Sequence, residues 1–182
     1  RDDKISNEDL EKRGVKILYC IFKALQPIHR VGYIHNDIKP ENILVLEDGK
    51  CVLTDFSYCS KSSIESKGTP HYVSPEVISK DGVSTSASDI YSLGITLYVF
   101  FTKSPFIEPN INENLRKIGD FNNITIDEIL RVPLYAKFFQ PNYYALEDIV
   151  SPKMVKLIES MTDLEPTKRP TVEKILPMLK SW

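Results

Sequence analysis

The segment from Ser86 to Phe101 constrains the fold most, because it is apolar on nearly every side of a helix. Its most apolar part, Ser92 to Phe101, is flanked by Asp89 and Lys103 and is much shorter than the ~20 residues that a membrane-spanning helix needs. A helix with so little polar surface has to be buried all round. The chain is therefore predicted to fold around a central buried helix.

Composition agrees with one globular domain. The chain has 182 residues, of which 42% are apolar and 26% charged, enough for one domain with its own core. The net charge is −2 and no basic block is present, which argues against nucleic acid as a partner, and no segment suits a membrane. The three cysteines lack metal-ligand spacing and favour a reducing compartment. We expect an intracellular protein, cytoplasmic or nuclear.

Helical signals recur along the chain. Ser6 is a capping residue for a helix expected from Asn7 to Arg30, in which apolar residues follow helical spacing. Ser151 before Pro152 predicts a helix that runs to about Thr162, and a last helix is expected to begin near Thr171. The segment from 106 to 150 is less clear, with short helices considered at 112–118 and 125–130.

One hairpin interrupts the helices. Two apolar runs, Ile43 to Leu46 and Lys50 to Thr54, are separated by the turn signal Asp48-Gly49. The polar, serine-rich stretch from Phe56 to Gly68 is predicted to be a loop. The fold class that follows is mainly α with one small β-hairpin.

The residues that carry chemistry surround this hairpin. The stretch His35–Asn42 (HNDIKPEN) precedes it, and Asp55-Phe56-Ser57 follows its second strand. Two carboxylates and an amide oxygen at strand ends suit phosphoryl transfer. One carboxylate can orient and deprotonate a hydroxyl, and the other can hold Mg²⁺ with the amide.

At these residues the chain resembles eukaryotic-type serine/threonine protein kinases. HNDIKPEN is similar to their catalytic loop H-R-D-L-K-P-E-N, and Asp55-Phe56-Ser57 to their D-F-G. Three further motifs follow in family order: Gly68–Glu76 (GTPHYVSPE), Asp89–Gly94 (DIYSLG) and Asp163–Thr171 (DLEPTKRPT). The resemblance covers about residues 7 to 182 and implies the C-terminal lobe of a kinase, with residues 1–182 as one domain.

The resemblance implies roles at matching positions. Asp37 would be the catalytic base toward the substrate hydroxyl, and Lys39 would contact the γ-phosphate of ATP. Thr69 would bridge toward both, and its presence with Lys39 implies serine/threonine rather than tyrosine specificity. Asn42 and Asp55 would ligate Mg²⁺, and Glu41 would line the ATP side.

Other matching residues are expected to support the site. His35 would brace the catalytic loop, Asp89 would hold the backbone of that loop, and Glu76 would form a buried pair with Arg169. We interpret His35 and also His29 and His71 as core residues with satisfied hydrogen bonds, not as metal ligands.

Two positions depart from the family pattern. Asn36 stands where most kinases carry an Arg that pairs with a phosphate on the activation loop, and Asn carries no charge for that pairing. We hypothesise that activity does not require activation-loop phosphorylation through this contact, although the loop offers Ser60, Ser62, Ser63 and Ser66. Ser57 replaces the Gly of D-F-G and restricts the backbone there.

The aromatic residues within 135–144 suggest a docking site for a partner, although packing against the lobe is the simpler interpretation. Solvent exposure of Phe138, Phe139 and Tyr143 would favour docking.

The glycine-rich loop, the V-A-I-K lysine and the hinge of the family have no counterpart in this sequence. We therefore expect the protein's own N-terminal lobe to be a partner and the 182-residue chain alone to be inactive.

Besides an active kinase that phosphorylates a protein, two functions are considered. One is a C-lobe-only or pseudokinase binding module that regulates another kinase, and the presence of the missing motifs upstream of Arg1 would separate the two. The other is a small-molecule kinase, against which the segments Gly68–Glu76 and Asp89–Gly94 argue, because in the family they build a peptide-binding platform.

Overall fold

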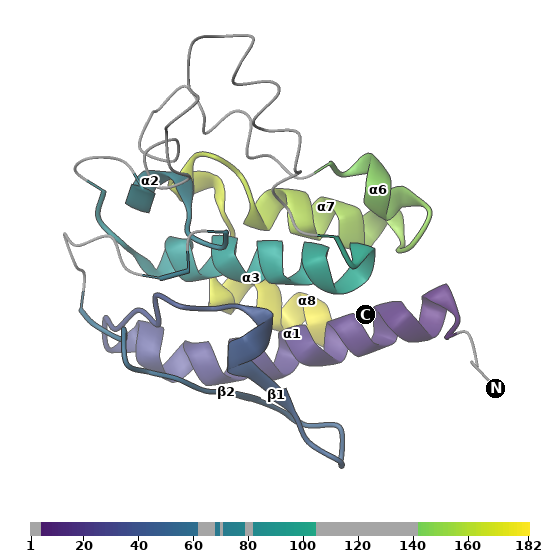
Figure 1. Cartoon of the computed structure of the whole chain (residues 1–182), viewed down its shortest axis with the longest axis horizontal. Coiled ribbons are helices and arrows are strands. Elements are labelled where there is room, and N and C mark those ends of the chain that lie inside the picture. The colour runs from purple at the N-terminus through teal and green to yellow at the C-terminus, as the bar shows by residue number, and fades with distance from the viewer. Residues whose placement is uncertain (1–4, 62–67, 70, 79–81, 105–141) are drawn as a thin grey trace, which may run out of the picture.

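The computed structural model describes residues 5–61, 68–69, 71–78, 82–104 and 142–182. Helices pack in layers beside a small hairpin (Figure 1). The elements in chain order are α1 (Asn7–Arg30), a 3-10 turn (Pro40–Asn42), β1 (Ile43–Val45), β2 (Cys51–Leu53), α2 (Pro75–Ile78), α3 (Ser86–Thr102), α6 (Tyr144–Glu147), α7 (Pro152–Met161), a second 3-10 turn (Pro166–Lys168) and α8 (Val172–Lys180).

Helix α3 is the central buried helix that the sequence predicts. Every residue from Ser88 to Tyr98 is buried, and the helix lies between α1 and α7 (Figure 1). Gly94 allows α7 to come close, because a Cβ at this position would lie 2.7 Å from the Thr162 methyl carbon. The helix ends one residue later than predicted, at Thr102.

Helix α1 has the predicted bounds. Ser6 Oγ accepts the Asp9 N–H at 3.1 Å, which is the expected N-cap. The fully buried residues of α1 line the side that packs against α8, α3 and β2; they are Leu18, Ile21, Phe22 and Leu25. Burial of these side chains is the main contribution to the stability of α1, at about 1.5–3 kcal/mol of free energy for each one.

The hairpin is present but shorter than predicted. Strands β1 and β2 are antiparallel, with Ile43 opposite Leu53 and Val45 opposite Cys51. Leu46 and Lys50 continue the pairing by one hydrogen bond outside the strands, at 2.8 Å. Gly49 closes the turn with a φ of 73°, a conformation that glycine adopts without strain.

The C-terminal helices also follow their predicted starts. Ser151 Oγ accepts the Met154 N–H at the start of α7, and α8 begins at Val172. The short helices α2 and α6 and both 3-10 turns were not predicted, because elements of three or four residues leave no periodic pattern. The short helices expected at 112–118 and 125–130 lie outside the described residues.

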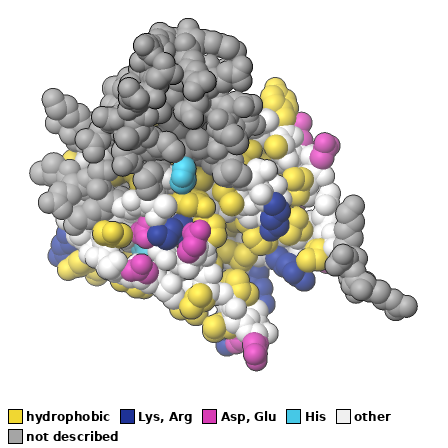
Figure 2. Space-filling model, viewed as in Figure 1, with side chains coloured by type: hydrophobic (Ala, Val, Ile, Leu, Met, Phe, Trp, Pro, Cys, Tyr) yellow, Lys and Arg dark blue, Asp and Glu magenta, His cyan; other side chains and the backbone are white. Residues whose placement is uncertain are grey.

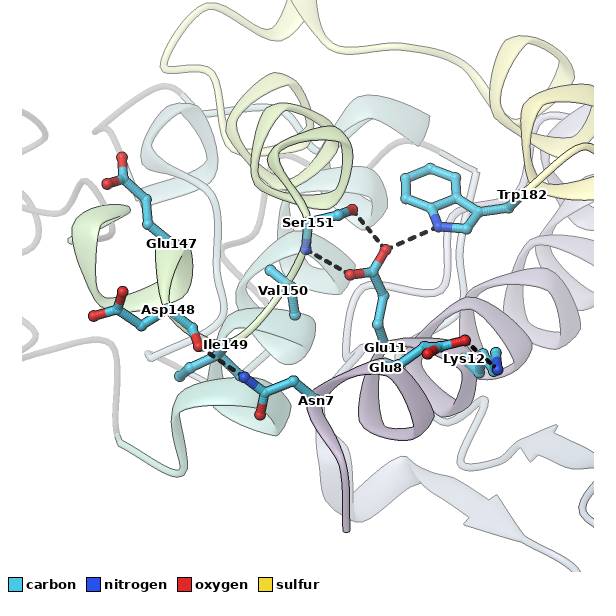
Figure 3. A pocket seen from close by; sticks show the side chains of 10 residues that line it. All are labelled: Asn7, Glu8, Glu11, Lys12, Glu147, Asp148, Ile149, Val150, Ser151 and Trp182. Atoms are coloured by element: carbon cyan, nitrogen blue, oxygen red, sulfur yellow. Dashed lines mark hydrogen bonds and ion pairs between the residues drawn. The ribbon is translucent and has the colours of Figure 1, made fainter.

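The start of α1 is tied to the end of the chain. The Glu11 carboxylate accepts the N–H and hydroxyl of Ser151, at 2.6 and 2.7 Å, and the indole N–H of Trp182 at 3.0 Å (Figure 3). Lys153 Nζ lies 4.0 Å from the centre of the indole ring. A cavity of about 500 Å³ adjoins this junction. Together these contacts join α1, the start of α7 and Trp182, the second residue after α8.

Charges of both signs are scattered over the described part of the face shown in Figure 2, without a block of one sign. No helix among the described residues is long and apolar enough to cross a membrane.

Candidate active site

The segment His35–Asn42 connects α1 to β1 and ends in a 3-10 turn. The side chain of Ile38 is fully buried in the core, which anchors the segment from beneath. Asp37 and Asn42 are also buried, with 3% and 6% of their surface exposed. Buried polar side chains need hydrogen-bond partners, and Asn42 and Asp37 are hydrogen-bonded to each other.

Four hydrogen bonds surround the Asp37 carboxylate. Oδ2 accepts Lys39 Nζ at 2.7 Å and Asn42 Nδ2 at 3.0 Å. Oδ1 accepts the hydroxyl of Thr69 at 2.8 Å and its N–H at 3.0 Å. Lys39 Nζ also donates to Thr69 Oγ1 at 2.7 Å, which closes a ring of three side chains. These four donors match the roughly four acceptor sites of a carboxylate.

This environment keeps Asp37 ionised. Burial acts to raise its pKa, but the hydrogen bonds from Lys39 and Thr69 and the charge of Lys39 outweigh burial, so the pKa lies below the ordinary 3.8. The site therefore holds a buried anion beside a cation at neutral pH.

Asp55 follows β2 and lies next to this cluster. The preceding residue, Thr54, donates its N–H and hydroxyl to Asn42 O at 2.9 and 3.1 Å, which ties the end of β2 to the segment His35–Asn42. The Asp55 carboxylate is exposed and accepts Ser57 Oγ at 2.6 Å. This hydrogen bond lowers the pKa of Asp55, on which the charges of Asp37 and Lys39 also act. Asp55 has a φ of 57°, in the left-handed region.

The donor set suits a hard cation. Mg²⁺ prefers carboxylate and carbonyl oxygens, and it binds through one or two carboxylates together with substrate phosphates. Among the described contacts, the hydrogen bonds of the Asn42 side chain are made by Nδ2, which donates to Asp37. The amide oxygen, Oδ1, is therefore the atom of this side chain that can bind a cation. The described residues contain no group of three or more His, Cys, Asp or Glu side chains that could hold a metal ion, so the candidate ligands here are one carboxylate and one amide.

Asp89 holds the backbone of the segment His35–Asn42, as predicted. Its carboxylate accepts the backbone N–H groups of His35 and Asn36, both at 2.9 Å, and contacts His29 Nε2 at 2.7 Å. Because Asp89 is in the central buried helix α3, the residues just before Asp37 are fixed to the core of the protein.

His35 braces the segment as a fully buried residue. Its Nδ1 accepts the Asp37 N–H at 3.3 Å, so the ring proton is on Nε2, which donates to Thr54 O at 3.0 Å. The ring also meets Phe56 edge-on, with centroids 4.8 Å apart. His35 thus links the segment His35–Asn42 to the residues on both sides of Asp55.

Glu76 and Arg169 form the predicted pair. Arg169 Nη1 and Nη2 bind the two carboxylate oxygens of Glu76 at 2.6 and 2.8 Å. The Arg169 side chain is fully buried, and Ser74 and Ser88 also donate to Glu76. Sequence analysis did not identify these two serines, because serine is too common in surface segments to indicate such a role.

Two predicted positions, Glu41 and His71, lie on the surface and outside the cluster around Asp37. Glu41 is exposed and is not part of the hydrogen-bonded cluster around Asp37; its charge acts on Tyr72. His71 is exposed, so its interpretation as a core residue is wrong. It lies in a turn at the surface that is closed by a hydrogen bond from the Tyr72 N–H to Thr69 O.

The aromatic segment 135–144 is described only from residue 142. Tyr143 is half-buried and its hydroxyl contacts Thr162 Oγ1 at 2.7 Å, so this ring packs against the lobe, whereas Tyr144 is 80% exposed. Phe138 and Phe139 lie outside the described residues, so the docking hypothesis for them stays a prediction.

A match to a known protein family agrees with the arrangement of the residues around Asp37. Residues 3–179 match the family described as protein kinase domain. The chain belongs to the protein kinase family. This kinase chain is 31% identical over 190 residues to CBL-interacting serine/threonine-protein kinase 20 of Arabidopsis thaliana, covering 99% of the chain and 38% of the relative. It is 28% identical over 181 residues to maternal embryonic leucine zipper kinase of Danio rerio, covering 94% of the chain and 24% of the relative.

A third similar protein is CBL-interacting serine/threonine-protein kinase 15 of Arabidopsis thaliana, 32% identical over 190 residues. That match covers 99% of the kinase chain and 40% of the relative. The chain therefore spans two fifths or less of the length of these curated relatives.

Proposed function

We propose that this chain is the catalytic C-terminal lobe of a protein serine/threonine kinase, which transfers the γ-phosphate of ATP to a hydroxyl of a protein substrate. The ring of Asp37, Lys39 and Thr69 carries the proposal. It combines an ionised carboxylate, a cation and a hydroxyl within 2.7–2.8 Å of one another. The serine/threonine kinases among the relatives support the same class of substrate.

Asp37 is the proposed base. Its carboxylate already accepts four hydrogen bonds, so a substrate hydroxyl has to replace one of them. Lys39 is the donor best suited to leave, because its side chain is 21% exposed and the γ-phosphate offers a competing anion. In this exchange Lys39 moves its charge to the phosphate, and Asp37 becomes free to accept the hydroxyl proton.

Asn42 and Asp55 are the proposed ligands of Mg²⁺. When bound, the ion would neutralise charge on the phosphates of ATP. The contact of Thr54 with Asn42 holds the two ligands at neighbouring ends of the hairpin. Glu41 is proposed to line the nucleotide side, a role that rests on its position in the motif and not on a contact.

The exposed face of the hairpin supports an N-terminal lobe as partner. Leu44 and Val52 are opposite each other in the register, and 50% and 43% of their surfaces are exposed. The Phe56 ring is also 46% exposed. A patch of apolar side chains on such a small element is typical of a surface that another part of a protein covers.

The test uses the intact protein that contains this chain, with ATP, Mg²⁺ and matched peptides that differ only in Ser, Thr or Tyr at the acceptor. We expect phosphorylation of the Ser and Thr peptides, a loss of at least 100-fold in kcat for Asp37→Asn, and no turnover by residues 1–182 alone. Activity that Asp37→Asn leaves unchanged, or transfer to Tyr only, would overturn the proposal. An intact protein that is folded yet inactive would favour the binding module.

A further inference from the structure

Two of the three cysteines lie next to each other where helix α1 packs against strand β2. The thiol of Cys51, in β2, is hydrogen-bonded to Cys20, in α1. Both are free thiols and both are half-buried, so each has some surface that a small molecule in solution can reach. Neither is part of the hydrogen-bonded cluster around Asp37, and the proposed reaction uses neither.

The pleat of the hairpin directs Cys51 toward α1. Successive side chains of a strand point to opposite faces, so the first and third residues of β2 share a face. Leu53 is buried in the core that α1 helps to form, whereas Val52 is exposed. Cys51 is therefore on the core side of β2, opposite Val45 and at the end of the strand that is nearer the turn.

Cys20 is on a part of α1 that faces the hairpin. Lys16 precedes it by one helical turn, and residues four apart lie on the same face of a helix. A Cβ at Gly49, in the hairpin turn, would lie 2.5 Å from Lys16 Nζ. The neighbouring Ile17 lines one cavity together with Ile43 of β1. These contacts place this turn of α1 against the hairpin independently of the two thiols.

The pair has a cation nearby, whereas the third cysteine has an anion. Burial, the neighbouring Cys20 and the hydrogen bond with it raise the pKa of the Cys51 thiol, and the charge of Lys16 lowers it. A nearby Lys stabilises the thiolate, which is the reactive form of cysteine. At Cys59, burial and the charge of Asp89 both raise the pKa of the thiol. Cys59 is therefore a suitable internal control for the pair.

Metal binding is the other common use of neighbouring thiols. Structural Zn²⁺ sites take four ligands, usually Cys and His. In the part of the chain that the structure describes, no three His, Cys, Asp or Glu side chains are grouped so that they could hold a metal ion. Two thiols in contact are, in contrast, all the groups that a disulfide requires. Oxidation is therefore the chemistry that this pair supports best.

We propose that Cys20 and Cys51 are a redox pair that hydrogen peroxide converts into a reversible disulfide between α1 and β2. One sulfur attacks a peroxide oxygen, the O–O bond breaks, and this sulfur becomes a sulfenic acid as one water forms. The other sulfur then displaces the hydroxyl group and forms the S–S bond as a second water forms. The two thiols lose two electrons and two protons in total, and one peroxide molecule accepts them.

The disulfide would tie the hairpin to α1. It would close a loop of the chain that contains the segment His35–Asn42, and it would hold the strand that leads into Asp55. In a reducing compartment, disulfides of this kind are transient and report on oxidants, because cellular thiols reduce them again. The bond itself does not depend on the proposed kinase function, and the experiments below do not measure phosphoryl transfer.

The first experiment maps the bond in the intact protein that contains this chain. The reduced, folded protein is treated with a small excess of hydrogen peroxide, its remaining thiols are alkylated, and it is digested with trypsin and Asp-N protease without reduction. Cleavage after Lys16, Lys23 and Lys50 and before Asp55 places the three cysteines in separate peptides. We expect mass spectrometry to find peptide 17–23 linked to peptide 51–54, and dithiothreitol to separate them.

Serine variants provide the controls for this map. We expect the linked peptides to be absent in Cys20→Ser and Cys51→Ser, and to form in Cys59→Ser as they do in the wild type. Peptides 17–23 and 51–54 that stay unlinked in the folded, peroxide-treated wild type would overturn the proposal. A sulfinic acid on either cysteine without a link, or a link to Cys59 instead, would overturn it too. This result for the wild type holds even if a variant fails to fold.

A second measurement tests whether the bond fits the folded hairpin. The Leu46 N–H donates to Lys50 O at 2.8 Å, next to Cys51. We expect this N–H to exchange with deuterium at least tenfold more slowly in the oxidised protein than in the reduced protein, and to return to the first rate after reduction. Peroxide should not change the rate in Cys20→Ser. Exchange that is equally fast or faster in the oxidised wild type would contradict a disulfide that ties the hairpin to α1.

Discussion

Arg169 binds Glu76 through both terminal guanidinium nitrogens, Nη1 and Nη2, although the two residues are 93 positions apart in the chain. The contact joins α2 to the 3-10 turn before α8. Arg169 also donates to Asp163 O and Ala87 O, at 2.8 and 3.0 Å, and its guanidinium lies 4.8 Å from the centre of the Tyr91 ring. Three parts of the lobe therefore depend on one buried cation.

The two partners of this pair should respond differently to removal. Glu76→Ala leaves the guanidinium, which has no exposed surface, without its anion, and we expect a loss of about 3–5 kcal/mol in the free energy of unfolding. Arg169→Ala leaves a carboxylate that is 20% exposed and still accepts from Ser74 and Ser88, so the loss should be smaller. Urea unfolding of the intact protein checks the order, which an equal or reversed loss would contradict.

The pH profile of the proposed reaction should depend on Lys39. The pKa of Asp37 is lower in the folded protein than the ordinary value of 3.8. The ionised carboxylate therefore contributes its full stabilisation of the fold above pH 3.8, and this contribution is lost as the pH falls through the lower pKa of the folded state. The wild-type kcat/KM should therefore show no acid limb from Asp37 near pH 6.

In Lys39→Met the largest lowering contribution is gone while burial remains, so the pKa of Asp37 should rise. We expect the acid limb to move toward neutral pH, in addition to a lower rate. Lys12→Met serves as the control, because Lys12 pairs with Glu8 on the surface of α1, far along the chain from the site. Identical profiles for wild type and Lys39→Met would show that Lys39 does not set the ionisation of Asp37.

Sequence patterns predicted the parts of the fold that are long and periodic. The bounds of α1 were correct because Ser6 is a capping residue and the apolar spacing is regular, and α3 was found because it has almost no polar face. The hairpin was predicted too long, since Leu46 and Thr54 are apolar or β-branched but lie beyond the ladder.

The residues of the candidate site were predicted, but only a few of their contacts were. The motifs brought Asp37, Lys39 and Thr69 into one hypothesis, but their order along the chain does not reveal that four donors fill the Asp37 carboxylate. The hydrogen bonds of Asn36 were also not predicted, because the sequence shows only that a charge is absent at this position. Its hydrogen bonds to Tyr58 and Ser60 depend on a backbone conformation with positive φ.

Ser57 should influence the proposed metal ligand Asp55. Its hydroxyl donates to Asp55 Oδ1 at 2.6 Å and its N–H to the same oxygen at 3.3 Å, so it both orients the carboxylate and withdraws negative charge from it. We expect Ser57→Ala, which keeps the backbone preference and removes the donor, to raise the pKa of Asp55 and change the KM for Mg²⁺ at least threefold.

The comparison with Ser57→Gly separates the hydroxyl from the backbone. Both variants lose the hydroxyl, but only Gly gains conformational freedom. Equal KM values for Mg²⁺ in the two variants would assign the effect to the hydroxyl. An unchanged KM in both would mean that Ser57 does not act on the metal site.

Glu11 and Trp182 provide a test that needs no catalysis. Burial acts to raise the pKa of the Glu11 carboxyl, but the hydrogen bonds from Ser151 and Trp182 outweigh it, so the pKa lies below the ordinary 4.5. Its stabilising effect should therefore be complete above pH 4.5 and be lost as pH falls through the lower folded value.

Because the chain has a single tryptophan, mutation and fluorescence report on the same contact in residues 1–182. Trp182→Phe removes the N–H donor but keeps a ring beside Lys153, and we expect it to lower the free energy of unfolding by about 1 kcal/mol at pH 7. Glu11→Gln should lose more, because Ser151 and Trp182 both lose a charged acceptor, and it should flatten the acid dependence of unfolding. In Glu11→Gln the fluorescence of Trp182 should also shift toward that of exposed indole. If Glu11→Gln unfolds at the same urea concentration as the wild type at both pH 7 and pH 4, this carboxylate does not hold the end of the chain to α1.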